Sequence, residues 1–510
     1  IPSLLVSRNS LVQNFLKLIL VNVPHVNVNN EVELAYIIRH IFLNFYIFFI
    51  LFIVVKKLCK LIGEKNAIIF LIVLYLIPSF NGHSMFNFAD IPLAMQFLLA
   101  AIFFIEGITG KSNKKNILIG LLFGLCLLTR ANSIVFLISL SLFQIFYFYS
   151  RKEKMIKVIK QNFLIYSVAV VVYFVGTPNN WRDPIGYLKG IYEFQFYPQN
   201  NVGTMVNGNF VNALSIPRTY LITNFTYKLP IIIIILFLVS LIFYFFIDKS
   251  KNITISFSIF FITYVFTLFY IFQPAAYDGI RHYLFLLPFF AILSSYSLCK
   301  LANQFNKKNN LIILFAILYL MYSQNGLEAY KYAYFNELVT EENISIDCDK
   351  YIGQAGCGDW ATDYWGFGGK ELVNLTNNYP PNNLLFCRPN YTYSSFLSID
   401  TPIEFLNGQM AWRDEFNQQR FEQSSFKRFY ARNEKPLIQL EEYLDNQEIE
   451  NLNFYAYVYH RPMDPGCDFQ RQLDQNKFNV ECKVVDGVKK RLRKYEIWIN
   501  YFLECNLEKK

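Results

Sequence analysis

The run Pro230–Ile247, PIIIIILFLVSLIFYFFI, indicates the fold class of this chain. It contains no charged residue, and an apolar helix of this length can cross most of a bilayer core of about 30 Å. The whole chain has the same character, because its 510 residues are 54% hydrophobic and 17% charged and the mean hydropathy is +0.26. This composition excludes a disordered chain and a soluble nucleic-acid-binding protein. It predicts a multi-pass membrane protein.

The apolar windows predict an all-α polytopic bundle of about ten transmembrane helices. Each window is long enough to cross, or nearly cross, the hydrocarbon core. The ten windows lie at about residues 34–55, 66–80, 91–108, 117–129, 132–149, 161–176, 230–247, 253–272, 283–299 and 311–325.

Basic residues gather in alternate loops between these windows. The formal net charge is +9, and in a membrane protein Lys and Arg first of all mark the cytoplasmic loops. The opposite loops, including the long segment 177–229, and the chain after the last window are therefore expected outside the cytoplasm. The predicted cytoplasmic loops contain Lys56, Lys114, Lys154, Lys249 and Lys308.

Cysteine placement points to the same topology. Six cysteines follow the last window, and an even number outside the cytoplasm allows up to three disulfides. Unpaired thiols in a cytosolic tail are the alternative. The six are Cys348, Cys357, Cys387, Cys467, Cys482 and Cys505. We expect three parts: a partial first outer loop with an amphipathic helix (1–33), a transmembrane domain (34–325) and an extracytoplasmic small α/β domain (326–510).

Polar residues at the outer ends of predicted helices are the candidate site, because polar groups there must be hydrated, paired or functional. The segment 81–92 enters the next helix through Asp90, for which ordinary helix capping is the alternative interpretation. The segment 277–283 holds Arg281 and His282, which can bind a phosphate. The alternative is an arginine that reaches towards lipid headgroups.

Two further features lie on the same side. The segment 334–338, followed by 363–366, starts the outer domain, and aromatic anchoring at the membrane interface is its alternative interpretation. Arg130 lies between two short windows at the outer face.

These motifs together resemble the GT-C membrane glycosyltransferases that use lipid-linked sugars, near the bacterial relatives of the dolichyl-phosphate-mannose protein mannosyltransferases. The resemblance extends from about Glu33, with Arg39 and His40 before a span, to about Leu375. Beyond about residue 381 we find no resemblance, and the six-cysteine tail departs from the family. The motifs are Gly82-His83-Ser84 with Asn87 and Asp90-Ile91-Pro92, Asp278-Gly279-Ile280-Arg281-His282-Tyr283-Leu284-Phe285 with Pro288, Tyr334-Phe335-Asn336-Glu337-Leu338, and Asp363-Tyr364-Trp365-Gly366.

The resemblance implies transfer of a sugar, a mannose-like hexose or similar, from polyprenyl or dolichyl phosphate to an acceptor hydroxyl on the extracytoplasmic side. Such a reaction needs an acidic side chain to take the hydroxyl proton and cations to stabilise the departing phosphate. By resemblance, Asp90 is the second of two acidic loop residues and orients the acceptor or a metal. Arg281 and His282 are then the phosphate ligands. Weaker candidates for donor or acceptor contacts are His83, Asn87 and Lys189.

The implied partners are the lipid-phosphate sugar, a protein, lipid or glycan acceptor, and membrane lipids, with no nucleic acid. The family leaves room for a divalent metal ion, but no ligand cluster in the sequence identifies one, so no cofactor is assigned. The expected location is the cell (inner) membrane, with the endoplasmic reticulum membrane as the alternative.

The first residues lack the acid that the resemblance requires. The family carries its principal catalytic acid in the first outer loop, whereas residues 1–33 contain no Asp, and their only acids are Glu31 and Glu33. Residues 11–23 suit an amphipathic helix on the outer surface better than a span. We therefore expect the principal acid upstream of Ile1, which would leave the chain inactive as written. Glu31 or, preferentially, Glu33 acting as the base is the alternative.

Two other function classes stay open at this stage. A transporter or lipid flippase places ionisable residues near the membrane midplane and often has inverted repeats with broken helices; only Arg130 between short windows favours it. A non-catalytic anchoring or assembly protein is the other class, because the C-terminal part resembles nothing known. A depth map of the ionisable residues separates the first class from a glycosyltransferase, and a turnover assay separates the second.

Overall fold

The computed structural model describes part of the chain in detail. The described residues are 31–108, 112–152, 155–186, 189–190, 193, 203–206, 209–249, 251–304, 309–339, 371, 375, 384–386, 403–406, 438–439, 451–459 and 478–509. The chain forms two compact units. The first takes residues 1–201, 214–324 and 334–337, and the second takes residues 202–213, 325–333 and 338–510.

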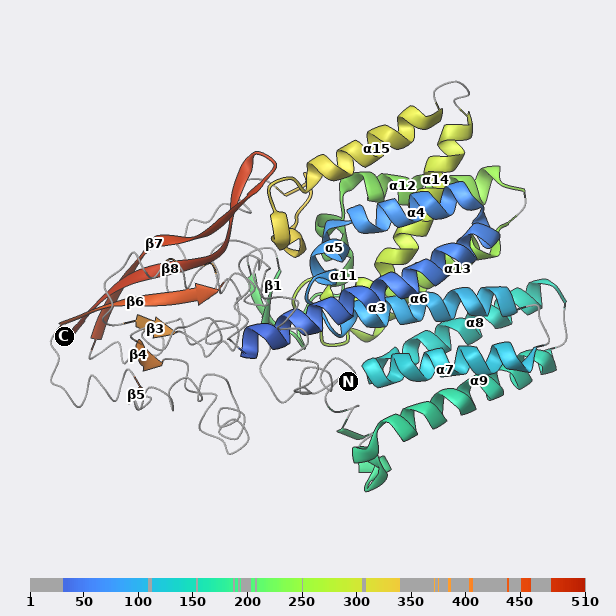
Figure 1. The fold of residues 1–510 in the computed structure, drawn as a ribbon, viewed down its shortest axis with the longest axis horizontal. Helices are drawn as coiled ribbons and strands as arrows, with labels where there is room; N and C mark the ends of the chain where they lie inside the picture. Colours follow the sequence, from blue (N-terminus) through green and yellow to red (C-terminus); the bar gives the residue numbers. More distant parts are fainter. Residues whose placement is uncertain are drawn as a thin grey trace. The chain divides into compact units, whose positions relative to one another are not determined.

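All regular secondary structure described in the first unit is helical (Figure 1). Each of the ten predicted apolar windows coincides with a helical segment. The helices are α3 (Glu31–Ile62), α4 (Glu64–Leu76), α5 (Pro78–Ser84), α6 (Asp90–Gly107), α7 (Asn113–Thr129), η1 (Ala131–Ser133), α8 (Ile134–Ser150), α9 (Met155–Gly176), η2 (Pro178–Trp181), α11 (Tyr220–Lys228), α12 (Ile231–Ile242), η3 (Phe243–Ile247), α13 (Ile253–Phe272), η4 (Arg281–Leu286), α14 (Leu287–Gln304) and α15 (Asn309–Ser323).

Fewer helices than ten are long enough to cross a membrane alone. Among the described residues, five helices have the length and apolar composition of a span, or up to seven if each bent pair is one span. Helices α8 and α15 are apolar but shorter. The predicted all-α multi-pass body is confirmed, and the expectation of about ten crossings exceeds the number of helices that meet these criteria by themselves.

Prolines explain the two bent pairs. Helices α4 and α5 meet at 73°, where Pro78 begins α5, and the segments 220–228 and 231–247 meet at 114° around Pro230. Proline lacks a backbone N–H and starts a new helix more readily than it continues an old one. The short arms of these pairs, α5 and α11, both carry buried polar side chains, namely Ser79, His83, Ser84, Asn224 and Lys228.

Helices α6 and α14 form the centre of the first unit, since 89% of the apolar window of each is buried. An aromatic cluster fills the space around α6: Phe97 lies 4.1 Å from the Phe136 ring and 4.6 Å from the Phe261 ring. Helix α3 instead leaves a row of phenylalanines exposed, as expected of a helix that faces lipid. These are Phe42, Phe45, Phe48, Phe49 and Phe52.

Glycines allow α7 and α9 to pack closely, and these helices run side by side in Figure 1. A Cβ atom on Gly120 would lie 2.7 Å from Val168 Cβ, and one on Gly124 would lie 2.4 Å from Val172 Cβ. Two small residues four apart on one face are a common way for membrane helices to approach each other.

Asp248 joins the end of α12 and η3 to α14. Its carboxylate accepts hydrogen bonds from the Tyr296 hydroxyl and from Lys300 Nζ, the latter at 2.6 Å. Burial opposes ionisation, yet the hydrogen bonds from Lys300 and Tyr296 keep the pKa of Asp248 below its ordinary value.

We expect Asp248→Asn to reduce the free energy of unfolding by about 1–3 kcal/mol at pH 7, because hydrogen bonds to a charged group are lost. The folded pKa lies below the unfolded value of about 3.9, so this stabilisation is present above about pH 4 and disappears as the pH falls further. Melting temperatures of the purified protein in detergent should therefore differ at pH 7 and converge below pH 4. A difference that is unchanged at low pH would contradict this explanation.

The second unit contains strands, as predicted for the C-terminal part. Antiparallel strands β1 (Gly203–Val206) and β2 (Asn209–Asn212) form a hairpin, and η6 (Glu328–Ala333) also belongs to this unit. A six-stranded mixed sheet has the order β5-β4-β3-β6-β8-β7. Pairing is parallel from β5 to β6, and β8 pairs antiparallel with β6 and β7. Its strands are β3 (Leu384–Phe386), β4 (Ile403–Leu406), β5 (Ile438–Gln439), β6 (Asn451–Tyr459), β7 (Phe478–Leu492) and β8 (Tyr495–Lys509).

Two contacts stabilise the second unit near β7. Gly326 has a φ of +88°, and a Cβ there would lie 2.5 Å from the Arg491 carbonyl oxygen, so only glycine fits. Lys490 forms ion pairs with Glu328 at 2.8 Å and Glu371 at 3.2 Å.

The described cysteines agree in part with the prediction that disulfides are confined to the C-terminal part. Cys505 is disulfide-bonded, whereas Cys59, Cys126 and Cys299 of the helical unit are free thiols. The side chains of the remaining five C-terminal cysteines lie outside the described residues.

Candidate functional site

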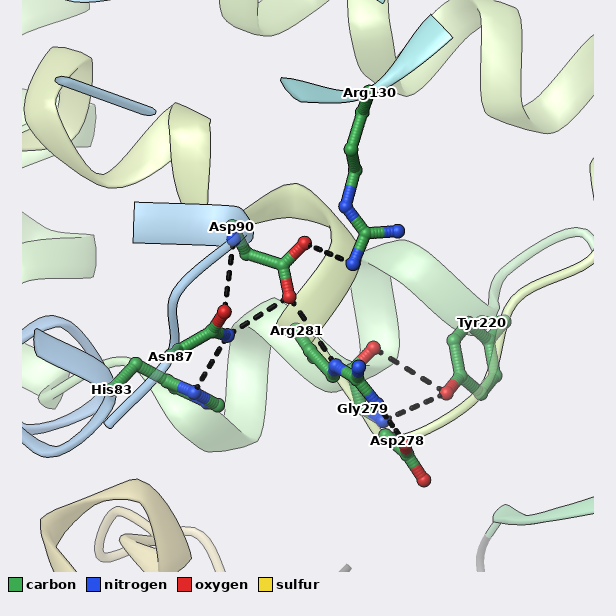
Figure 2. A network of polar contacts seen from close by, with 8 residues as sticks. All are labelled: His83, Asn87, Asp90, Arg130, Tyr220, Asp278, Gly279 and Arg281. Carbon is green, nitrogen blue, oxygen red and sulfur yellow. Dashed lines mark hydrogen bonds and ion pairs between the residues drawn. The ribbon is translucent and has the colours of Figure 1, made fainter. Parts of the chain in front are cut away.

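Asp90 is the centre of a polar cluster inside the helical unit. It is the first residue of α6, and its side chain is 4% exposed. Figure 2 shows its carboxylate between two guanidinium groups: Arg130 Nη2 lies 2.5 Å from one oxygen and Arg281 Nε lies 3.3 Å from the other. Asp90 and Arg281, which are 191 residues apart in sequence, therefore meet in the fold.

The capping interpretation of Asp90 is wrong, because the carboxylate accepts from side chains rather than from the first helical N–H groups. Asn87 takes that place: its Oδ1 accepts hydrogen bonds from the backbone N–H groups of Asp90 at 2.9 Å and Ala89 at 3.2 Å. Asn87 Nδ2 then donates to Asp90 Oδ2 at 2.9 Å and lies 3.3 Å from His83 Nδ1. One buried amide therefore fixes both the backbone and the carboxylate of Asp90.

Arg281 begins η4 and bridges two carboxylates. Besides Asp90, it contacts Asp278 Oδ2 through Nη1 at 2.7 Å, and its side chain is 14% exposed. An arginine that reaches out to lipid headgroups would be more exposed, so this alternative interpretation does not describe Arg281. A planar guanidinium suits such a bridge because its N–H groups point in fixed, different directions.

A left-handed turn places Arg281. Asp278 and Gly279 have φ values of +59° and +65°, and the Arg281 N–H donates back to the Asp278 carbonyl at 3.3 Å. The Tyr220 hydroxyl accepts from Gly279 N–H at 3.0 Å and lies 3.4 Å from the Gly279 carbonyl oxygen. Tyr220 on α11 thus holds the turn that carries Arg281 (Figure 2).

Arg130 joins the site from the break between α7 and η1. It is the C-cap of α7 in extended conformation, and its side chain is 28% exposed, more than that of Arg281. The sequence predicted that Arg130 lies at the outer face but indicated no role for it in the site. The break between two short apolar windows was the available signal, since a buried polar residue at a helix break is often a ligand contact.

The other candidates have described contacts with other residues. His282 packs its ring against Tyr277, with the centroids 4.6 Å apart. Lys189 is exposed and lies 3.7 Å from Glu193 on its own segment. Arg39 and His40 of α3 instead pack on Phe88, next to Asn87. The side chain of Glu33, residues 1–30 and the motif 363–366 lie outside the described residues.

The segment 334–337 belongs to this unit and is buried rather than anchored at an interface. Tyr334, Phe335 and Asn336 are at most 1% exposed. Asn336 Nδ2 donates to the Thr226 and Leu229 carbonyl oxygens, which occupies acceptors at the end of α11. The anchoring interpretation of these residues is therefore wrong.

The cluster offers guanidinium N–H donors but little net charge. Arg130 and Arg281 carry two positive charges, and Asp90 and Asp278 carry two negative ones. Both Asp90 oxygens are already in ion pairs, so this carboxylate positions the two arginines. Among the described residues, no three His, Cys, Asp or Glu side chains are grouped to hold a metal ion.

No family model and no curated protein matches the sequence. Among solved structures, the chain is similar to the crystal structure of ArnT from Cupriavidus metallidurans in the apo state, with 10% identity and a TM-score of 0.45 over 92% of this chain and 83% of ArnT. It is also similar to ArnT from the same organism bound to undecaprenyl phosphate, with 9% identity and a TM-score of 0.43 over 96% of this chain and 87% of ArnT. The function of this chain therefore has to be argued from its own residues.

Proposed function

We propose that this chain is a membrane glycosyltransferase that moves a sugar from a polyprenyl-phosphate carrier to an acceptor hydroxyl. The observation that carries the proposal is the buried Asp90 carboxylate held between Arg130 and Arg281. Three separate helix boundaries supply these residues. Two of these boundaries, those of Asp90 and Arg281, coincide with motifs that resemble GT-C enzymes, 82–92 and 278–288.

The arginines would bind the phosphate of the donor. Guanidinium groups recognise phosphate oxygens through paired N–H donors, and buried donors do so without reorganising during the reaction. Arg130 is the more exposed of the two and is the better placed to meet an incoming headgroup. Undecaprenyl phosphate, the ligand of the ArnT structure above, is a carrier of this chemical class; the proposal rests on the site and the motifs rather than on that likeness.

In the proposed reaction, the acceptor oxygen bonds to the anomeric carbon while the bond from that carbon to the phosphate oxygen breaks. The electron pair stays on the phosphate oxygen, next to the guanidinium groups, and the acceptor proton goes to a general base. Asp90 would be a positioning residue in this scheme, because its two oxygens are taken. The base would be a second acid, as the family resemblance implies.

Two finer assignments belong to the same proposal. The sugar would be a hexose of mannose-like type, and transfer would take place on the extracytoplasmic side of the cell (inner) membrane. Arg130, the one feature that favoured a transporter, lies in the same cluster as Asp90 and Arg281, which weakens the transporter interpretation.

The test is a transfer assay with the full-length protein in membranes and a radiolabelled polyprenyl-phosphate hexose. We expect label to pass to a membrane-associated acceptor, with loss of transfer in Arg281→Met. Lys189→Ala is the control, since this cation is exposed and its described ion pair is with Glu193. No transfer from a panel of hexose donors, or equal transfer by wild type and Arg281→Met, would contradict the proposal.

A further inference from the structure

Lys228 is a buried lysine that the site described above does not use. The residue is 4% exposed, and its Nζ has no hydrogen-bond partner among the residues that the structure describes. The contact of its ammonium group is the Phe335 ring, whose centroid lies 3.4 Å away. A ring face attracts a cation but does not replace the hydrogen bonds that water supplies.

The surrounding residues hold Lys228 in this position. Asn336, the neighbour of Phe335, donates its backbone N–H to the Tyr227 carbonyl at 2.9 Å. The Ser79 hydroxyl donates to the Lys228 carbonyl at 3.4 Å. The backbone that carries Lys228 is therefore held from both α5 and the segment 334–337.

Lys228 points to the same turn that carries Arg281. Tyr220, Asn224 and Lys228 are spaced by four residues, so they share one face of α11. Tyr220 binds Gly279, and a Cβ on Gly279 would lie 3.4 Å from Asn224 Oδ1 and 3.9 Å from Lys228 Cε. His83 lies within electrostatic reach of both Lys228 and Arg281.

Charge balance gives this position a role in the proposed function. The cluster of two arginines and two aspartates is formally neutral, so it supplies no net positive charge to balance even the single negative charge of a phosphodiester donor. After transfer, the phosphate is a monoester with a charge between −1.5 and −2 at about pH 7. The additional charge needs a further cation, and Lys228 is a buried lysine beside the turn whose Nζ has no hydrogen-bond partner among the described residues.

We propose that Lys228 is an anion-binding residue that contacts the phosphate monoester of the lipid carrier. This inference rests on the proposed function, which it deepens by naming the residue that binds the phosphate of the product. The ammonium donates hydrogen bonds to the phosphate oxygens and compensates the charge that appears when the sugar leaves.

The test is ligand-dependent thermal stabilisation of the full-length protein in detergent. The probes are farnesyl phosphate, its methyl diester, the neutral alcohol farnesol, and inorganic phosphate. We expect farnesyl phosphate to bind most tightly and Lys228→Met to weaken it about 10- to 100-fold, the effect of losing a hydrogen bond to a charged group. The affinity for the methyl diester should differ less than threefold between wild type and Lys228→Met, and farnesol should stabilise both proteins equally.

Lys57→Met is the matched control. Lys57 also lies over a phenylalanine ring, Phe103 at 4.8 Å, but it has a carboxylate partner in Glu106 at 2.7 Å. We expect this variant to bind farnesyl phosphate like wild type and to melt at a lower temperature, because Glu106 loses its partner. Without ligand, Lys228→Met should melt at the wild-type temperature or higher, since removing an unpaired buried charge does not destabilise.

Each outcome decides the inference. Unchanged binding of farnesyl phosphate by Lys228→Met, equal binding of inorganic phosphate, or a lower melting temperature without ligand in a variant that still folds would overturn it. If Lys228→Met does not fold, Lys228→Arg should keep the binding and Lys228→Gln should lose it, and equal binding by these two would also overturn it. If binding depends on Lys228 but no sugar is transferred from any donor, the proposed function fails while the anion site stands.

Discussion

Asp90→Asn should lower the rate of sugar transfer by about 10²- to 10⁴-fold. The amide keeps the shape of the side chain but removes the charge that holds Arg130 and Arg281 together in a buried site. Both guanidinium groups then lose their shared partner, and a displaced catalytic donor costs about as much as a removed one. The measurement is transfer from a polyprenyl-phosphate hexose in membranes, with the amount of folded protein determined in parallel.

Asp248→Asn is the control for this variant. It makes the same chemical change at a carboxylate that also pairs with a cation, Lys300, in another part of the same unit. We expect Asp248→Asn to lose stability but to keep transfer within about twofold per folded molecule, since surface and structural changes away from a site leave its chemistry intact. If Asp90→Asn retained full transfer per folded molecule, Asp90 would have no part in the reaction.

The positioning role of Asp90 also makes a specific kinetic prediction. If Asp90 acts through the arginines, Asp90→Asn should raise the KM for the donor as well as lower kcat, because the donor phosphate meets misplaced guanidinium groups. A direct proton acceptor would instead affect mainly kcat and would remove one limb of the pH–rate profile. The two readouts separate these roles without a further structure.

The helical body could be predicted from the sequence because its signal is local. An apolar run such as residues 230–247 has the length and composition of a buried or lipid-facing helix whatever it packs against. The number of complete crossings could not be predicted in the same way. Pro78 and Pro230 bend their segments by 73° and 114°, and whether such a bend lies inside a span or beside it depends on tertiary packing.

Residues of the candidate site could be predicted only where a suitable polar side chain lay at the boundary of a predicted helix. Asp90 and Arg281 each stand at a helix start in a recognisable motif, so their meeting was predictable. Arg130 has no motif around it, and its contact with Asp90 is set by how α7 packs against α6.

The buried polar residues on the short helices α5 and α11 were harder to identify from the sequence. Lys228 precedes an apolar window and has the sequence position of an interfacial lysine, yet it is buried beneath Phe335. The regular spacing of Tyr220, Asn224 and Lys228 was the signal that could have identified this face. Asn87 was predicted to contact the sugar donor or the acceptor molecule. In the structure, its amide group holds Asp90.

Arg281→Lys should lower sugar transfer about 10²- to 10³-fold, although the positive charge is kept. Arg281 contacts Asp90 through Nε and Asp278 through Nη1, so two carboxylates are bridged by one rigid group. A lysine ammonium is a point charge that can approach one of them but cannot span both while presenting donors to a phosphate. Removal of one fixed donor from a charge-stabilising site typically costs this factor in kcat.

Arg130→Lys gives the matched comparison, because Arg130 contacts Asp90 through Nη2 and makes no second carboxylate contact among the described residues. We expect it to retain at least about tenfold more transfer than Arg281→Lys, since a single ion pair can be remade by an ammonium group. Transfer rates from the same membranes, corrected for folded protein, make the comparison. Equal rates for the two lysine variants would mean that the bridge between Asp90 and Asp278 is not what the reaction requires, and that Arg281 acts only through its charge.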